Sequence, residues 1–131
     1  MDLNEVCFVS QDSDIGCLNI KISNLTWDKH SDKEMIREEL LITIIRSCTS
    51  ALLHSQENNN DFFNVRVDAS NLKFKHLDRK LIKLVSESLQ TLFPDKLNEC
   101  HIYNTSKLFN QFYDIIKLFI DKKTRRKITI V

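Results

Sequence analysis

The sequence predicts an α/β fold: one small domain, residues 1–131, in which helices cover a largely parallel, mixed sheet. Strand-like alternation and helical periodicity follow one another in the order strand–helix–strand–helix–strand–helix–strand, which is typical of parallel sheets. Length and composition agree, because 131 residues with 42% hydrophobic and 28% charged side chains suit a single core. One glycine and one proline exclude a loop-rich or collagen-like chain.

The N-terminal part predicts two strands that flank a polar turn. Residues 5–9 and Cys17–Ile22 alternate apolar and polar side chains, as half-buried strands do, and Gln11–Gly16 is expected to form the turn. Trp27 lies in the loop Asn24–His30. We expect it to pin this loop to the core; contact with a membrane interface is the weaker alternative.

A long helix is expected from Ser31 to about His54. Ser31 and Glu34 have the spacing of a capping box, in which each side chain bonds the other residue's backbone N–H. The apolar residues on its buried side are Ile36, Leu40, Leu41, Ile44, Ile45, Cys48 and Leu52.

The clearest strand is Asp61–Asp68, where Phe63, Val65 and Val67 share one face. A helix follows over Lys75–Phe93, and Pro94 ends it because proline cannot donate a helix hydrogen bond. Its inward residues are Leu77, Leu81, Leu84, Val85, Leu89 and Leu92. Basic residues gather on or near its N-terminal half: Lys73, Lys75, Arg79, Lys80 and Lys83.

The segment from Cys100 to Val131 predicts a short strand, a helix over 106–120 and a last strand over 127–131, with Thr105 or Ser106 as the helix N-cap. This helix has two adjacent apolar stripes, wider than one core contact requires. The stripes are Leu108, Phe112, Ile115 and Phe119, and Phe109, Tyr113, Ile116 and Ile120. Either the helix is buried between two layers, or something beyond its own scaffold shares this surface.

A succession of short motifs carries a family resemblance. The motifs are Phe93-Pro94-Asp95-Lys96-Leu97, His101-Ile102-Tyr103-Asn104, Phe109, Leu118-Phe119-Ile120-Asp121-Lys122-Lys123-Thr124 and Lys127-Ile128. In order and spacing they resemble the C-terminal half of a CRAL-TRIO lipid-binding domain. Upstream, Asp14-Ile15-Gly16 resembles the sequence before the first sheet strand in that family, and residues 67–72 resemble the end of one of its strands. The resemblance covers residues 7–131.

The resemblance implies a non-catalytic protein that binds a lipid or another small hydrophobic molecule between the sheet and the 106–120 helix. The side chains expected to contact the ligand are Phe63, Val65, Leu89, Phe109, Phe112, Ile116 and Phe119. The strand face of Phe63 and Val65 has none of the hydroxyls with which relatives hold phosphatidylcholine. This favours an acyl chain or a non-phospholipid hydrophobe, or a site that has collapsed into plain core.

Charge adds a candidate headgroup or membrane contact. Residues 1–61 carry 5 Lys/Arg against 11 Asp/Glu, and residues 62–131 carry 14 against 7, so balances of −6 and +7 give the net +1. A basic half beside an apolar face suits a phosphoinositide or an anionic membrane surface. The candidates are Asp95, Lys122, Lys123, Arg125, Arg126 and Lys127. The alternatives for this basic run are a solvated turn and a nucleic-acid contact. Against a nucleic-acid contact, the run has no interleaved aromatic residues that could stack on bases.

Three departures from the family separate this chain from a complete domain. Asp95 replaces a glutamate that, in phosphatidylinositol-binding members, pairs with a lysine beyond the last strand; Thr105-Ser106 replaces Ala-Pro. The family's N-terminal helical module and its closing segment have no counterpart, so we expect a short viral or protist form, or a fragment. Its cavity is then incomplete or completed by a second copy. The alternative function is a protein–protein module with a filled core that self-associates or binds a partner.

No pattern indicates catalysis, a metal or a cofactor. One glycine cannot build a phosphate loop or a serine elbow, and the four histidines lack ligand spacing. The four cysteines are irregularly spaced and are expected to be reduced, small hydrophobic residues in the core or near the surface. The acidic N-terminus is unlike a signal peptide, and no apolar run is long enough to span a membrane. We therefore expect a cytoplasmic protein that contacts membranes peripherally.

Overall fold

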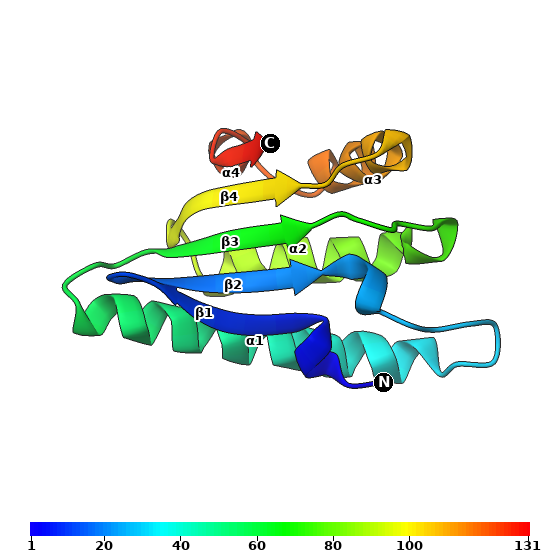
Figure 1. Ribbon diagram of the computed structural model, residues 1–131, viewed down its shortest axis with the longest axis horizontal. Helices are drawn as coiled ribbons and strands as arrows, with labels where there is room; N and C mark the ends of the chain where they lie inside the picture. Colours follow the sequence, from blue (N-terminus) through cyan, green and yellow to red (C-terminus); the bar gives the residue numbers. More distant parts are fainter.

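The structure is a computed structural model that describes residues 1–131 as a five-stranded sheet and four helices (Figure 1). The strands are β1 (Cys7–Asp12), β2 (Ile15–Lys21), β3 (Phe63–Asp68), β4 (Leu97–Tyr103) and β5 (Ile128–Ile130). The helices are α1 (Lys33–Glu57), α2 (Arg79–Leu92), α3 (Lys107–Lys117) and α4 (Lys122–Arg125). Short 3₁₀ turns occupy Leu3–Glu5, Ile22–Asn24 and Phe74–His76.

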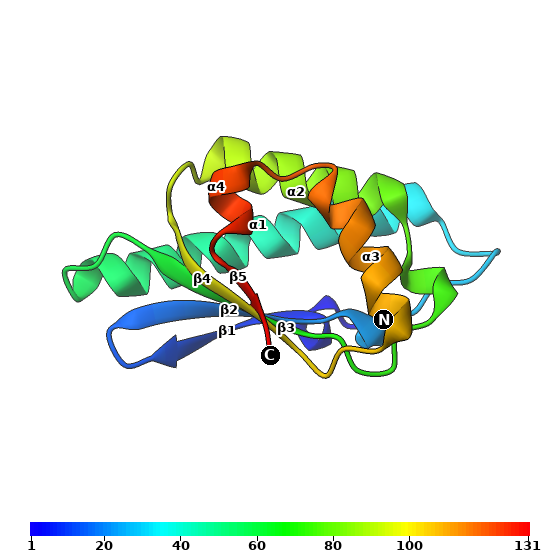
Figure 2. The ribbon, with the colours of Figure 1, turned by 90° about the horizontal axis from the view of Figure 1, so that it is seen from above.

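The strands lie in the order β1-β2-β3-β4-β5, with β1 antiparallel to β2 and all other pairs parallel. The predicted α/β class with a largely parallel, mixed sheet is therefore confirmed. Every crossover steps in the same direction across the sheet, so crossovers of one hand place their helices on one face. Figure 2 shows this arrangement, with all the helices on the same side of the strands.

The opposite face of the sheet is polar. Asn19, Arg66 and His101 lie side by side on neighbouring strands and alternate with the residues that face the helices. Arg66 also pairs with Asp12 of β1 at 2.6 Å. The two faces thus differ as period-2 alternation predicts.

The N-terminal hairpin is tighter than predicted. The predicted turn Gln11–Gly16 is wrong, because β1 runs to Asp12 and β2 begins at Ile15. Only Ser13 and Asp14 connect them, and Ser13 adopts a left-handed φ of 59°. Hydrogen bonding between the strands continues through the polar residues, which the hydrophobic pattern alone does not reveal.

Two predicted helix starts are also wrong, and aspartate explains both. Asp32 rather than Ser31 caps α1 and accepts a hydrogen bond from the Met35 N–H at 3.1 Å, while the Ser31 hydroxyl accepts from Asp28. Asp78 caps α2, which therefore begins at Arg79 and not at Lys75. The carboxylate is a charged acceptor at the positive end of each helix, and it fixes the first turn.

The predicted 106–120 helix is shorter in the structure, where α3 spans Lys107–Lys117, and a separate short helix follows it. Ser106 is the N-cap of α3, but its side chain makes no cap hydrogen bond. The helix ends at Lys117, where the Leu118 N–H bonds to the Ile115 carbonyl. Asp121 then caps the short helix α4 by accepting from Thr124.

Helix α1 packs closely on the sheet because β2 has a glycine at the contact. A Cβ on Gly16 would lie 2.0 Å from the Ala51 carbonyl oxygen. The Gly16 N–H donates to the Ser55 hydroxyl at 2.8 Å, and that hydroxyl donates to the Ala51 carbonyl at 3.2 Å. Both Ala51 and Ser55 are fully buried, so the absence of a side chain at Gly16 sets the helix–sheet distance.

Several single-residue predictions are confirmed in the core. All four cysteines are buried and free, and burial raises the pKa of the Cys7 thiol to about 11 and that of Cys100 to about 12. Trp27 is 4% exposed and donates from Nε1 to the Lys75 carbonyl at 2.9 Å. It therefore pins its loop to the core as expected.

We predict that Gly16→Ala destabilises the protein by about 2 kcal/mol or more, because the new methyl group meets helix backbone that has no room to move. Urea unfolding measures the loss. Ser50→Ala, at an exposed position of α1, is the matched control and should change the midpoint little. Equal midpoints for Gly16→Ala and the wild type would contradict the close contact between β2 and α1.

Candidate functional site

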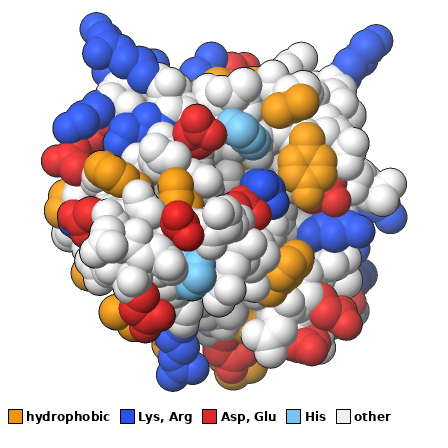
Figure 3. Space-filling model, turned by 60° about the vertical axis from the view of Figure 1, so that its left-hand side comes forward, with side chains coloured by type: hydrophobic (Ala, Val, Ile, Leu, Met, Phe, Trp, Pro, Cys, Tyr) orange, Lys and Arg blue, Asp and Glu red, His pale blue; other side chains and the backbone are white.

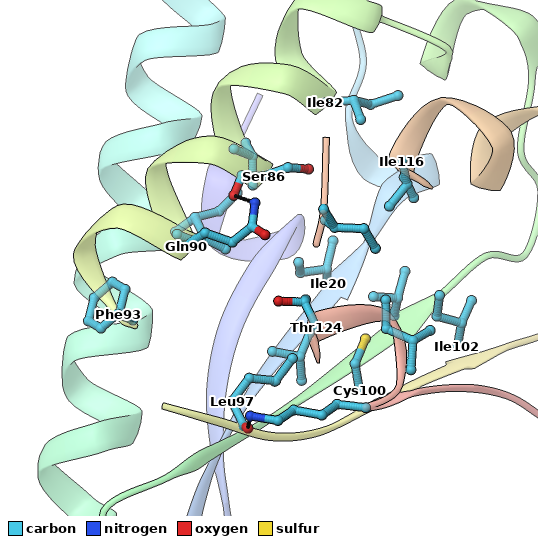
Figure 4. Close-up of a pocket in the computed structure, with 18 of the residues that line it drawn as sticks. Ile20, Ile82, Ser86, Gln90, Phe93, Leu97, Cys100, Ile102, Ile116 and Thr124 are labelled. Atoms are coloured by element: carbon cyan, nitrogen blue, oxygen red, sulfur yellow. Dashed lines mark hydrogen bonds between the residues drawn. The ribbon is translucent and has the colours of Figure 1, made fainter. Parts of the chain in front are cut away.

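The main cavity lies between the sheet and the helices that cover its β3–β5 side. It has a volume of about 350 Å³, and 21 of its 29 lining residues are hydrophobic. Figure 4 shows side chains from β4, α2 and α3 converging on it, with Cys100 and Ile102 on one side and Ile82 and Ile116 on the other. The space is thus bounded by the sheet, by α2 and α3, and by α1 through Leu40 and Ile44.

The floor of the cavity is apolar because β3 and β4 present their inward rows there. Val65 pairs in register with Cys100, and Val67 with Ile102; all four line the cavity. Phe63 lines it too and meets the Phe93 ring edge-on, with centroids 5.7 Å apart and planes at 82°. The apolar face that the sequence predicts for Asp61–Asp68 therefore faces an open space.

The opposite wall comes from α2 and α3. Leu89 of α2 and Phe112 and Ile116 of α3 line the cavity, as do Phe63 and Val65 of the predicted set. Phe109 and Phe119 do not line it. Phe109 is 1% exposed, and its ring stacks on Phe112 at 6.5 Å.

Helix α3 leaves no aromatic ring fully exposed, although its two predicted stripes are not all buried. Phe112 is buried and Tyr113 is half-buried. Phe119 is half-buried beneath the Arg79 guanidinium, which lies 5.6 Å from the ring centroid. The wide apolar face of this segment is therefore divided between a local aromatic core and the cavity.

A charged rim closes one end of the cavity. Two carboxylates and two ammonium groups line this end, those of Asp95, Asp121, Lys123 and Lys127, whereas Lys122, Arg125 and Arg126 lie outside the lining. Lys123 donates a hydrogen bond to Asp95, which holds the pKa of that carboxyl below its ordinary value and raises the pKa of the ammonium. Lys127 donates from Nζ to the Leu97 carbonyl at 2.7 Å.

Asp95 has its partner within α4. Lys123 pairs with it, where phosphatidylinositol-binding members of the family pair a glutamate with a lysine beyond the last strand. Asp95 also has a left-handed φ of 61° in the turn between α2 and β4. Aspartate tolerates this conformation better than most residues do, so turn geometry and ion pair both favour it here.

No pattern in the sequence indicates the role of Gln90. Its side-chain nitrogen donates to the Phe119 carbonyl at 2.7 Å, and its oxygen accepts from the Asp121 N–H at 3.0 Å. The same nitrogen donates to the Ser86 carbonyl within α2. One amide from α2 thus holds the connection between α3 and α4, and residues 29 and 31 positions apart give no pattern that would reveal it.

An ion pair positions the other end of α2. Arg37 of α1 donates to both carboxylate oxygens of Asp78, at 3.0 and 2.8 Å, and the two side chains are only 14% and 12% exposed. Burial alone would raise the pKa of Asp78, but the hydrogen bonds from Arg37 and from the Leu81 N–H lower it overall. The bidentate geometry fixes α2 relative to α1.

The structure contains neither a candidate metal site nor a helix that could span a membrane. No group of three or more His, Cys, Asp or Glu side chains could hold a metal ion. None of the helices combines the length and apolar character needed to cross a bilayer. On the face in Figure 3, hydrophobic side chains form small separate patches among charges of both signs. The apolar cavity with its charged rim is therefore the outstanding site.

Comparisons with known proteins agree with this geometry. The family model described as "CRAL/TRIO domain" matches residues 7–131. Clavesin-1 of Xenopus laevis is 30% identical over 105 residues, which are 78% of this chain and 30% of that protein. Phosphatidylinositol transfer protein SFH5 of Candida glabrata is 29% identical over 83 residues, 61% of this chain and 28% of that protein.

A solved structure shares the fold. The crystal structure of Sfh5 superimposes with a TM-score of 0.75 over 98% of this chain and 47% of that one, at 19% sequence identity. The chain thus spans less than a third of the length of these curated relatives and about half of the solved chain.

We predict that Asp78→Asn lowers the free energy of unfolding by about 2 kcal/mol at neutral pH, because a charge-assisted pair is lost while the amide still caps α2. The lowered pKa of Asp78 means that the pair stabilises the wild type above the ordinary carboxyl value of 3.8 and fails as pH falls below it. The variant should lack this part of the acid dependence in urea unfolding.

Asp114→Asn is the matched control, since Asp114 pairs with Lys117 on the surface and is 73% exposed. It should change stability by a few tenths of a kcal/mol at most. If Asp78→Asn behaves like Asp114→Asn at every pH, the pair does not position α2.

Proposed function

This chain belongs to the CRAL/TRIO domain family, and from that premise we propose that it binds a lipid or another small hydrophobic molecule in the cavity between its sheet and α2–α3. The single observation that carries the proposal is an open, predominantly apolar space of about 350 Å³. Ligand sites in proteins commonly measure about 300 to 1,000 Å³ and have this composition.

The energetics favour an apolar occupant. Transfer of each methylene from water into such a space contributes about 0.8 kcal/mol. The polar groups drawn in the interior are few; Ser86, Gln90 and Thr124 are labelled in Figure 4. Gln90 already bonds backbone groups, which leaves hydroxyls as the free polar contacts. A hydrocarbon chain therefore suits the interior better than a headgroup does.

The charged rim suits the polar end of the ligand. We propose that Lys123 and Lys127, beside Asp95, contact an anionic group there, with Lys122, Arg125 and Arg126 providing further positive charge outside the cavity. A phosphoinositide fits this charge, and one relative is named as a phosphatidylinositol transfer protein. Lipid transfer between membranes, in the cytoplasm, is the activity that we propose.

The alternative of a protein-binding module requires a filled core. A cavity of about 350 Å³ favours ligand binding over that alternative. We also propose a non-catalytic role, because the acidic and basic side chains of the lining lie at its rim, where Asp95 and Lys123 are already paired with each other.

We predict that Ile116→Trp reduces binding of a fluorescent fatty acid or phospholipid at least tenfold, because the larger ring occupies the cavity from the α3 wall. Stability should change little, since the ring fills existing space. Leu118→Trp is the matched control: the residue is 61% exposed just beyond the same helix and should leave binding unchanged.

Native mass spectrometry of the purified protein gives an independent test. The wild type should show an added mass from a bound molecule that organic solvent extracts, and Ile116→Trp should show less of it. The proposal would be contradicted if the wild type carried no bound lipid and took up no fluorescent lipid from vesicles. If Ile116→Trp retained full binding, the ligand would bind outside this cavity.

A further inference from the structure

The 3₁₀ turn Phe74–His76 presents an exposed aromatic side chain that the cavity does not use. Phe74 is 72% exposed, more than any other phenylalanine among the exposed large hydrophobic residues. Lys73 and Lys75 flank it, and both are exposed. Exposure of an entire phenyl ring to water is unfavourable by about 2 kcal/mol, so its position between two cations calls for an explanation.

The backbone beneath Phe74 is firmly held. His76 is 2% exposed, and its Nδ1 accepts from the Lys73 N–H at 2.9 Å; the Leu77 N–H closes the turn on the Phe74 carbonyl at 3.0 Å. Trp27 anchors the turn from the other side through the Lys75 carbonyl. Burial, with the charges of Lys75 and Lys73, lowers the pKa of His76, which keeps Nδ1 an acceptor at neutral pH.

Positive charge surrounds this turn. Arg79, Lys80 and Lys83 are exposed on the first two turns of α2. Asp78 is the single acidic residue between positions 71 and 86, and Arg37 neutralises it. The neighbouring loop 28–34 carries charges of both signs. The surface around Phe74 is therefore basic, with an apolar projection at its centre.

We propose that Phe74, Lys73 and Lys75, supported by Arg79 and Lys80, form a docking turn that inserts Phe74 into the interface of an anionic membrane. Aromatic rings are favourable at the level of the headgroups, and each nearby lysine adds attraction to anionic lipids. A rigid turn loses little conformational entropy on docking. An acidic protein surface would match the lysines but would not require a protruding phenyl ring.

The docking turn is separate from the cavity rim. It precedes the N-terminus of α2, whereas Asp95 and Lys123 lie beyond its C-terminus, and a helix of 14 residues spans about 21 Å. Figure 2 shows the two ends of α2 well apart, with α4 near one of them. Docking therefore does not depend on whether the cavity binds a lipid, and each proposal can fail alone.

Co-sedimentation with vesicles tests the docking turn directly. The wild type should bind vesicles of phosphatidylcholine mixed with phosphatidylserine, bind pure phosphatidylcholine weakly, and dissociate as salt is raised. Phe74→Ser should weaken binding about tenfold or more, and Lys73→Gln with Lys75→Gln about fivefold for each lysine. Folding should be unaffected, because these side chains make no core contact.

Two matched controls separate this site from general stickiness. Phe62→Ser removes a ring that is 45% exposed before β3, and Arg46→Gln removes an exposed charge of α1 that belongs to neither proposed site. Both should bind vesicles like the wild type. Equal losses in the controls, or wild-type binding by Phe74→Ser, would overturn the proposal, as would an acidic protein ligand combined with no vesicle binding.

A label gives a second readout. The four native cysteines are buried with raised thiol pKa values, so Phe74→Cys can be labelled selectively with an environment-sensitive dye. On anionic vesicles its emission should shift to the blue and be quenched by nitroxide lipids. A label at Phe62→Cys should show neither change, and an unshifted label at position 74 would place the turn outside the bilayer.

Discussion

The cavity depends on how polar contacts near its two ends position α2 over the sheet. Arg37 grips Asp78 at the start of the helix, and Gln90 bonds the Phe119–Asp121 backbone near its end. Helix α1, by contrast, lies against β2 at the distance set by Gly16. Leu81 and Ile82 of α2 pack in the core with sheet residues, while the directed bonds fix the two ends of the helix, and an open space remains between α2 and the sheet.

The sequential strand order strengthens this arrangement. Since all crossovers place their helices on one face, α1, α2 and α3 share that face and leave the other to polar side chains such as Asn19 and His101. Helix α1 packs on β2 and also lines one side of the cavity through Leu40 and Ile44, and α2 and α3 cover the β3–β5 side. Interior and surface thus follow from topology as much as from composition.

Much of the fold could be predicted from the sequence, because β3 and the helices carry clear apolar periodicity. The predicted starts of α1 and α2 differ from the structure because Asp32 and Asp78 are the N-caps. Residue spacing alone does not distinguish them from neighbouring candidate caps. The candidate site is harder to predict from the sequence than the fold. Val65 and Ile116 have the same pattern whether they face a cavity or a packed core, and the Asp95–Lys123 and Gln90 contacts join residues far apart in the chain. Only three-dimensional coordinates separate these cases.

The scarcity of hydrogen-bonding groups inside the cavity has a consequence for selectivity. A wall of aliphatic side chains such as Val67 and Ile82 discriminates occupants by length and girth, and it rejects an added hydroxyl only weakly. Chemically different molecules of similar bulk then compete on nearly equal terms, and their relative abundance in the surrounding medium decides which one is carried.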